Sequence, residues 1–124
     1  MSPRSDEYLE AARRRLAHAH HSLGGGFYDG AASAAYYAMF HAAKAALSEA
    51  DTYAKTHSGV WSRFSELYVR TGLVPGDLAS VGINAQGRRE QVEYDFKHVT
   101  RDEASALMTA AERFVQVIED HFAE

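Results

Sequence analysis

Apolar residues recur at helical spacing along the chain, in stripes separated by glycine, proline and candidate capping residues. The first stripe follows Ser5, a candidate N-cap, and stops at the glycine run 24–26, which can adopt the left-handed conformation that ends helices. Its members are Tyr8 or Leu9, Ala12, Leu16, Ala19 and Leu23. This spacing predicts a first amphipathic helix.

The second stripe is rich in alanine and carries aromatic side chains between the small ones. It begins near Asp29, another candidate N-cap, runs to about Leu47, and includes Tyr36, Tyr37 and Phe40. Because small residues let a neighbouring backbone approach closely, the pattern predicts the central and most buried helix. It also predicts a surface for self-association.

Two further helices are predicted after a polar connection. Thr56 or Ser58 is the candidate cap of the third helix, and the fourth begins near Pro75, a residue favoured at the first helical position. Gly82 and Gly87 fall inside the fourth helix, where each costs about 1 kcal/mol relative to alanine. The fourth helix is therefore expected to be weak or bent.

The last helix starts at the capping box formed by Thr100 and Glu103 and keeps its apolar face to the C-terminus. No segment of any length alternates with the period of a β-strand. The expected fold is all-α, an up-and-down bundle of four to five helices, forming one domain over residues 1–124.

Composition narrows the classes of function. The 124 residues include no cysteine, which excludes disulfides, thiolate catalysis and zinc sites built on sulfur. The absence of a long apolar run or a signal-like N-terminus leads us to expect a cytoplasmic protein without membrane contact, and no motif calls for a metal or a cofactor. The net charge of −4 disfavours a general polyanion coat, but thirteen lysines and arginines can still form a local basic cleft.

Two polar features do not fit a plain helical bundle. Arg89 lies on or beside the apolar stripe of the fourth helix, between Ala85 and Val92, where an arginine needs a partner. It either extends to the edge and pairs with Glu93, or is held there for an anion. The polar stretch 55–59 falls at a helix start, whose free N–H groups either bind an anion or are capped by a side chain.

Three segments, taken in order, resemble the HEPN domain family of small prokaryotic helical proteins. Residues 34–47 (AAYYAMFHAAKAAL) are similar to the family's second helix. Residues 55–60 (KTHSGV), followed by 69–72 (VRTG), are similar to a stretch typical of one uncharacterised branch. Residues 89–95 (REQVEYD) resemble that branch's Arg-x-x-Ala-Asp-Tyr-Asp. The resemblance extends from about residue 5 to residue 122.

The resemblance implies a bundle that dimerises through its inner helices and is paired with a minimal nucleotidyltransferase as toxin and antitoxin. Many members are metal-independent ribonucleases, whose motif is an arginine followed, after four to six residues, by a histidine in the dimer cleft. Here the position after Arg89 and four intervening residues holds Tyr94. The next histidine, His98, is nine positions after Arg89, which is the opposite face of a continuous helix.

Three interpretations remain open. The chain is a dimeric module that binds RNA or a partner protein with little nuclease activity, or it is an active ribonuclease toxin. In the second case Arg89 binds the phosphate and Tyr94 or His57 transfers the proton. A third interpretation, compatible with either, makes Tyr94 the acceptor of a nucleotide from the transferase. The predicted site is Arg89, Tyr94 and His57 for the chemistry and Arg88, Lys55 and Asp95 for binding.

Overall fold

The computed structural model describes residues 2–95 and 98–123, with only the backbone described for residues 93–95. Its elements, in chain order, are α1 (Pro3–Gly24), α2 (Tyr28–Glu49), α3 (His57–Phe64), the π-helical turn η1 (Ser65–Val69), α4 (Gly76–Asp95) and α5 (Arg101–Phe122). The described ranges contain no strand. The all-α prediction is therefore confirmed.

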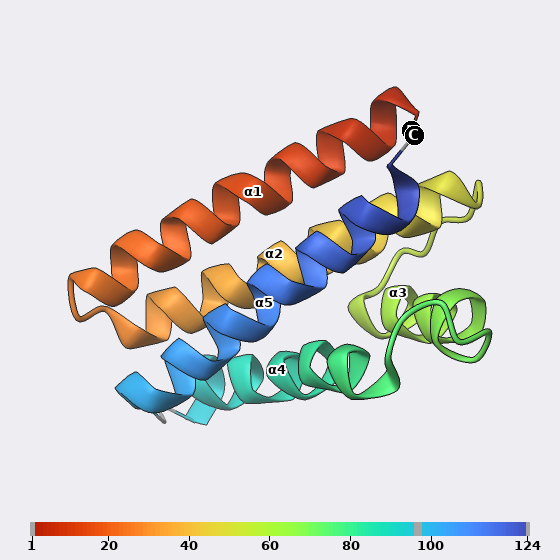
Figure 1. The fold of residues 1–124 in the computed structure, drawn as a ribbon. Helices are drawn as coiled ribbons and strands as arrows, with labels where there is room; N and C mark the ends of the chain where they lie inside the picture. Colours follow the sequence, from red (N-terminus) through yellow and green to blue (C-terminus); the bar gives the residue numbers. More distant parts are fainter. Residues whose placement is uncertain (1, 96–97, 124) are drawn as a thin grey trace.

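Helix α2 is the centre of the fold, as its small residues predicted. It packs against α1, α3, α4 and α5, and its alanines are almost all buried. Figure 1 shows α1, α2 and α5 running alongside one another, with α4 on the far side of the bundle from α1 and α3 near the C-terminal half of α2. The close approach of these backbones follows from the missing side-chain bulk along α2.

Two predicted helix starts are confirmed by their hydrogen bonds. The Thr56 hydroxyl accepts a hydrogen bond from the backbone N–H of Gly59 at 2.9 Å, which caps α3. Thr100 and Glu103 form the reciprocal capping box at the start of α5. Each bond satisfies a backbone donor that a helix N-terminus leaves unpaired.

The predicted cap of the first helix was wrong. Helix α1 begins at Pro3, and the hydroxyl of Ser2 caps it by accepting from the backbone N–H of Ser5. Ser5 is instead fully buried, and its hydroxyl lies 2.9 Å from Oε2 of Glu49 and 3.2 Å from the carbonyl oxygen of Ala45. Ser5 therefore connects α1 to the end of α2.

The predicted cap at Asp29 was also wrong. The N-cap position of α2 is Phe27, which makes no side-chain capping bond. The Asp29 carboxylate accepts a hydrogen bond from the backbone N–H of Val99 at 2.8 Å and lies 3.0 Å from Nδ1 of His98. These two contacts, the Val99 bond first, hold the pKa of Asp29 below its usual value. Asp29 thus fastens the start of α2 to the segment before α5.

The expectation that the fourth helix is weak or bent stays a prediction, but its two glycines do not break the helix. Helix α4 begins one residue after Pro75 and is continuous to Asp95. Gly82 is buried against the indole ring of Trp61, and a Cβ built on Gly82 would lie 2.5 Å from the nearest ring atom. Glycine is therefore required at this crossing of α3 and α4. Among the described residues, none of the helices has both the length and the apolar character needed to cross a membrane.

Candidate functional site

Tyr36 is the centre of the candidate site. Its side chain is fully buried on α2, and its hydroxyl lies 2.7 Å from Nδ1 of His57 and accepts a hydrogen bond from Nε1 of Trp61 at 3.3 Å. Burial raises the pKa of Tyr36, although the Trp61 bond and Arg89 oppose the shift, so the phenol stays protonated at neutral pH. The two contacts bind α3 to α2 at a single polar atom.

His57 is the first residue of α3, where the Thr56 cap fixes the direction of the chain. Its ring stacks on Phe40 with ring centres 4.2 Å apart and planes 7° from parallel. Burial lowers the pKa of His57, and the nearby charges of Arg89 and Lys44 lower it further, so the imidazole is neutral at pH 7. Because Nδ1 contacts the Tyr36 hydroxyl, Nε2 is the ring nitrogen left for a ligand, and it has no hydrogen-bond partner within the described parts of the chain.

Arg89 reaches the same aromatic residues from α4. Its guanidinium carbon lies 5.7 Å from the ring centre of Tyr36 and 5.4 Å from that of Tyr37, and the residue is half-buried. A guanidinium over aromatic rings is held by cation–π attraction, and a guanidinium is the side-chain group that matches a phosphate with two parallel hydrogen bonds. Arg89 and His57, far apart in sequence, thus share Tyr36.

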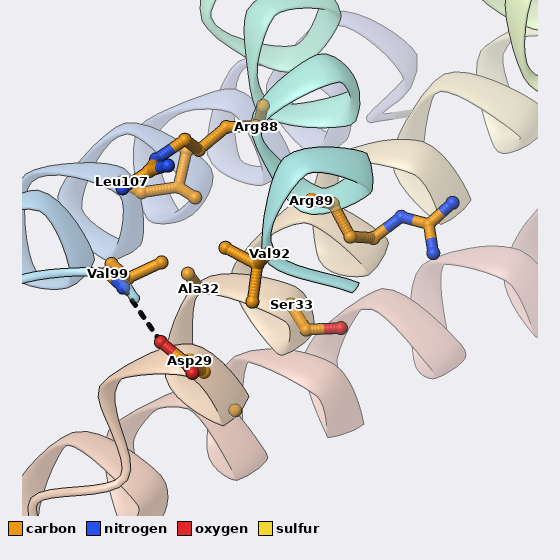
Figure 2. Close-up of a pocket in the computed structure, with 10 residues that line it drawn as sticks. Asp29, Ala32, Ser33, Arg88, Arg89, Val92, Val99 and Leu107 are labelled. Carbon is orange, nitrogen blue, oxygen red and sulfur yellow. Dashed lines mark hydrogen bonds between the residues drawn. The ribbon is translucent and has the colours of Figure 1, made fainter. Parts of the chain in front are cut away.

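Arg88 points the opposite way from Arg89 (Figure 2). Its guanidinium donates hydrogen bonds to the Glu103 carboxylate at 3.0 and 3.2 Å, and to the carbonyl oxygen of His98 at 3.0 Å. The hydrogen bond from Arg88 is the main reason that the pKa of Glu103 is lowered. Arg88 therefore connects α4 to α5, and a role in ligand binding stays a prediction.

The other predicted site residues are not brought to Tyr36 by any described contact. Lys55 is exposed in the connection before α3. Tyr94 and Asp95 belong to the last turn of α4, but their side chains lie outside the described residues, as does that of Glu93. His98 is exposed, and its imidazole ring contacts the Asp29 carboxylate. The roles predicted for these residues stay predictions.

A cavity of about 230 Å³ adjoins Arg89 on the side of α5. Its walls are largely apolar side chains, and the charged groups at its edge, Asp29 and Arg88, are already engaged by Val99 and Glu103 (Figure 2). The apolar walls are Ala32, Ala85, Val92, Val99 and Leu107. Because the cavity offers few polar groups to a ligand, we take the surface at Arg89 and His57, and not the cavity, as the candidate site.

Sequence reasoning missed Tyr36, which it named only as one of the aromatic residues of the buried second helix. A signal was present, because a tyrosine inside a buried alanine-rich helix needs a polar partner for its hydroxyl. No cluster of three or more candidate metal ligands occurs within residues 2–92 and 98–123. The groups at the site are thus a guanidinium, a neutral imidazole and a phenol.

The structure is thus an all-helical bundle that holds an arginine and an imidazole against aromatic residues of its central helix. The family model of the HEPN domain matches residues 5–121, and the chain belongs to the HEPN domain family. The resemblance found in the sequence is thereby confirmed.

Named relatives span most or all of the chain. The UPF0332 protein glr0978 of Gloeobacter violaceus is 27% identical over the full length of both chains. A UPF0332 protein of Archaeoglobus fulgidus is 39% identical over 73% of each chain. A protein of Methanocaldococcus jannaschii named "Putative toxin MJ0605" is 30% identical over 89% of this chain and 82% of its own length.

Proposed function

We propose that this chain is the HEPN component of a prokaryotic toxin–antitoxin pair. In this proposal it acts as a dimeric module, folded as one domain, that binds RNA at the site around Arg89 and associates with a minimal nucleotidyltransferase. Membership of the HEPN family and the toxin names carried by relatives support the toxin–antitoxin role. The RNA-binding role rests on the chemistry of the site.

The position of Arg89 is the observation that carries the proposal. A half-buried guanidinium over two tyrosine rings keeps a fixed direction, which reduces the entropy lost when it binds a phosphate. Nε2 of His57 can add a further hydrogen bond in the tautomer that carries its proton there. In that tautomer Nδ1 accepts a hydrogen bond from the Tyr36 hydroxyl. This direction agrees with the bond from Trp61, because the hydroxyl oxygen then accepts from Trp61 and donates to His57.

Binding of labelled single-stranded RNA to the purified chain tests this function. Arg89→Ala is expected to lose most of the affinity, and Arg89→Lys to recover only part because an ammonium cannot form the paired hydrogen bonds. Arg113→Ala, which removes one exposed arginine from α5, is the control and should bind like the parent. Equal affinity of Arg89→Ala and the parent, with both folded by circular dichroism, would show that the site is not used.

The remaining parts of the proposal have separate tests. Analytical ultracentrifugation is expected to give a dimer. Co-purification with the nucleotidyltransferase encoded beside it is expected to give a stable complex. A monomer that binds neither RNA nor the transferase would contradict the module as a whole.

The neutral imidazole favours a second function, metal-independent RNA cleavage. In the tautomer with the proton on Nδ1, Nε2 of His57 can take the proton of a ribose 2′-hydroxyl. The 2′-oxygen would then form a bond to phosphorus while the bond from phosphorus to the 5′-oxygen breaks. The proton ends on that leaving oxygen, and Arg89 offsets the charge that develops on the phosphorane. The products would be a 2′,3′-cyclic phosphate and a 5′-hydroxyl.

Incubation of labelled RNA with the chain in EDTA separates binding from cleavage. Cleavage that His57→Ala abolishes while affinity is kept would establish the nuclease, with Tyr94→Phe as the second variant because the sequence also nominates that residue. Intact RNA after incubation with the folded dimer would leave the binding function alone.

A further inference from the structure

The aromatic surface around Arg89 continues along α2 and carries two more cations. The guanidinium carbon of Arg15, from α1, lies 5.0 Å from the ring centre of Tyr37, the same ring that Arg89 approaches at 5.4 Å. Farther along α2, Nζ of Lys44 lies 5.3 Å from the ring centre of Phe40, on which His57 stacks. We call Arg15, Tyr37, His41, Lys44, His57 and Arg89 the cationic face.

One acidic side chain of the described residues, Glu90 on α4, acts on Tyr36 and His57 in this region, and Arg15 and Lys44 are not paired with it. Arg15 and Lys44 form no ion pair with any acidic side chain in the described part of the chain. The preceding arginines of α1 differ, because Arg14 pairs with Glu10 at 2.8 Å and Arg13 pairs with Glu119 of α5. Arg15 and Lys44 therefore keep positive charges that no carboxylate of the described residues pairs with.

The pKa of His41 responds to the positive charges near it. It is half-buried between Tyr37 and Lys44 on α2, and its Nδ1 atom is buried without a hydrogen-bond partner among the described residues. Burial lowers the pKa of His41 to about 4, and Arg15, Lys44 and Arg14 all act in the same direction. Arg14 is offset by Glu10, but Arg15 and Lys44 are not paired with a described carboxylate, and the positive surface that they form around His41 suits an external anion.

We propose that Arg15 and Lys44 extend the Arg89 site into a track for the sugar–phosphate backbone of single-stranded RNA. The inference rests on the RNA-binding function proposed above and adds two residues, from α1 and α2, that bind phosphates flanking the one at Arg89. A row of cations beside a half-exposed aromatic ring is the arrangement that follows a single strand.

Salt-dependent RNA binding tests the track with matched charge removals. Each phosphate contact to a single strand contributes about 0.7 to the slope of log affinity against log salt. Arg15→Ala and Lys44→Ala are each expected to weaken binding of labelled oligouridine about three- to tenfold and to lower that slope by about 0.7. Arg113→Ala, which removes one exposed arginine from α5, should change neither.

The outcomes separate this inference from the function on which it rests. If Arg89→Ala loses binding while Arg15→Ala and Lys44→Ala bind like the parent, the track is wrong and the Arg89 site stands. If the parent binds no RNA, both are wrong. If the two variants keep RNA affinity but dissociate the dimer, or lose the nucleotidyltransferase partner, the face contacts protein and the RNA track is overturned. Circular dichroism of each variant shows that the comparison is made between folded chains.

Discussion

The crossing of α3 and α4 at Gly82 gives the sharpest test of the packing. A Cβ built on Gly82 would lie 2.5, 2.8 and 3.0 Å from three atoms of the Trp61 ring. The ring cannot swing aside freely, because Phe64 and Phe114 pack against it edge-on and its Nε1 donates to Tyr36. Gly82→Ala therefore forces a rigid, buried side chain to move.

Two effects of opposite sign decide the magnitude. Alanine gains about 1 kcal/mol over glycine in a helix. Overpacking a filled core costs about 1–3 kcal/mol, and loss of the Trp61–Tyr36 hydrogen bond adds about 1 kcal/mol. The steric terms are larger, so Gly82→Ala is expected to lower the free energy of unfolding by about 1–3 kcal/mol.

Urea unfolding followed by circular dichroism and by the fluorescence of Trp61, the only tryptophan, measures both effects. Gly87→Ala is the matched control on the same helix, because its Cβ would meet nothing within 4 Å and the site is exposed. That variant should gain about 0.5–1 kcal/mol from helix propensity alone. A Gly82→Ala protein as stable as the parent, with unchanged tryptophan emission, would refute the packing described for this crossing.

Two further predictions concern the polar groups. Tyr36→Phe leaves Nε1 of Trp61 and Nδ1 of His57 without their hydrogen-bond partner. The free energy of unfolding, measured in urea, should fall by about 1–2 kcal/mol, and RNA binding should weaken. An unchanged unfolding midpoint would contradict these hydrogen bonds. The pKa of His41 is about 4 in the fold and 6.5 in the unfolded chain, so the unfolded state takes up the proton first as pH falls. The His41 contribution to stability is complete above about pH 6.5 and should decline by on the order of 1 kcal/mol, after allowance for solvent screening, as pH falls toward 4. His41→Gln should flatten that decline, and a parent-like pH profile in this variant would rule out His41 as its source.

Helical periodicity was enough to predict the fold class and most element positions. The stripe of α1 and the capping box at Thr100 are local features, encoded within a few residues, and both are present in the structure. The predictions failed at positions whose role depends on a residue distant in the sequence. Asp29 has the chemistry of a cap, but the backbone N–H of Val99 lies close enough to take its carboxylate. Gly82 looks unfavourable until the Trp61 ring is placed against it.

The candidate site was predictable as residue types but not as an arrangement. The misfit of Arg89 on an apolar stripe marked it from the sequence, and the polar start of α3 marked His57. Their meeting depends on how α3 and α4 pack on α2, which no local spacing determines. The role of Tyr36, whose hydroxyl contacts His57 and whose ring lies near Arg89, was hidden for the same reason, because these partners come from other helices.

The net charge of the chain is a weak predictor of the charge of a local surface, for a related physical reason. Seventeen acidic residues outnumber thirteen basic ones, which by itself disfavours a polyanion ligand. Acidic side chains, however, pair with particular arginines, as Glu103 does with Arg88 and Glu10 with Arg14, whereas Arg15 of α1 and Lys44 of α2 form no ion pair among the described residues. Screening confines exposed charges to about 8–10 Å at physiological salt, so a ligand at this face experiences the local cations more than the molecular total. An acidic protein can therefore present a basic surface. The charge of a ligand that fits such a surface depends on which side chains form ion pairs there, and not on the net charge of the protein.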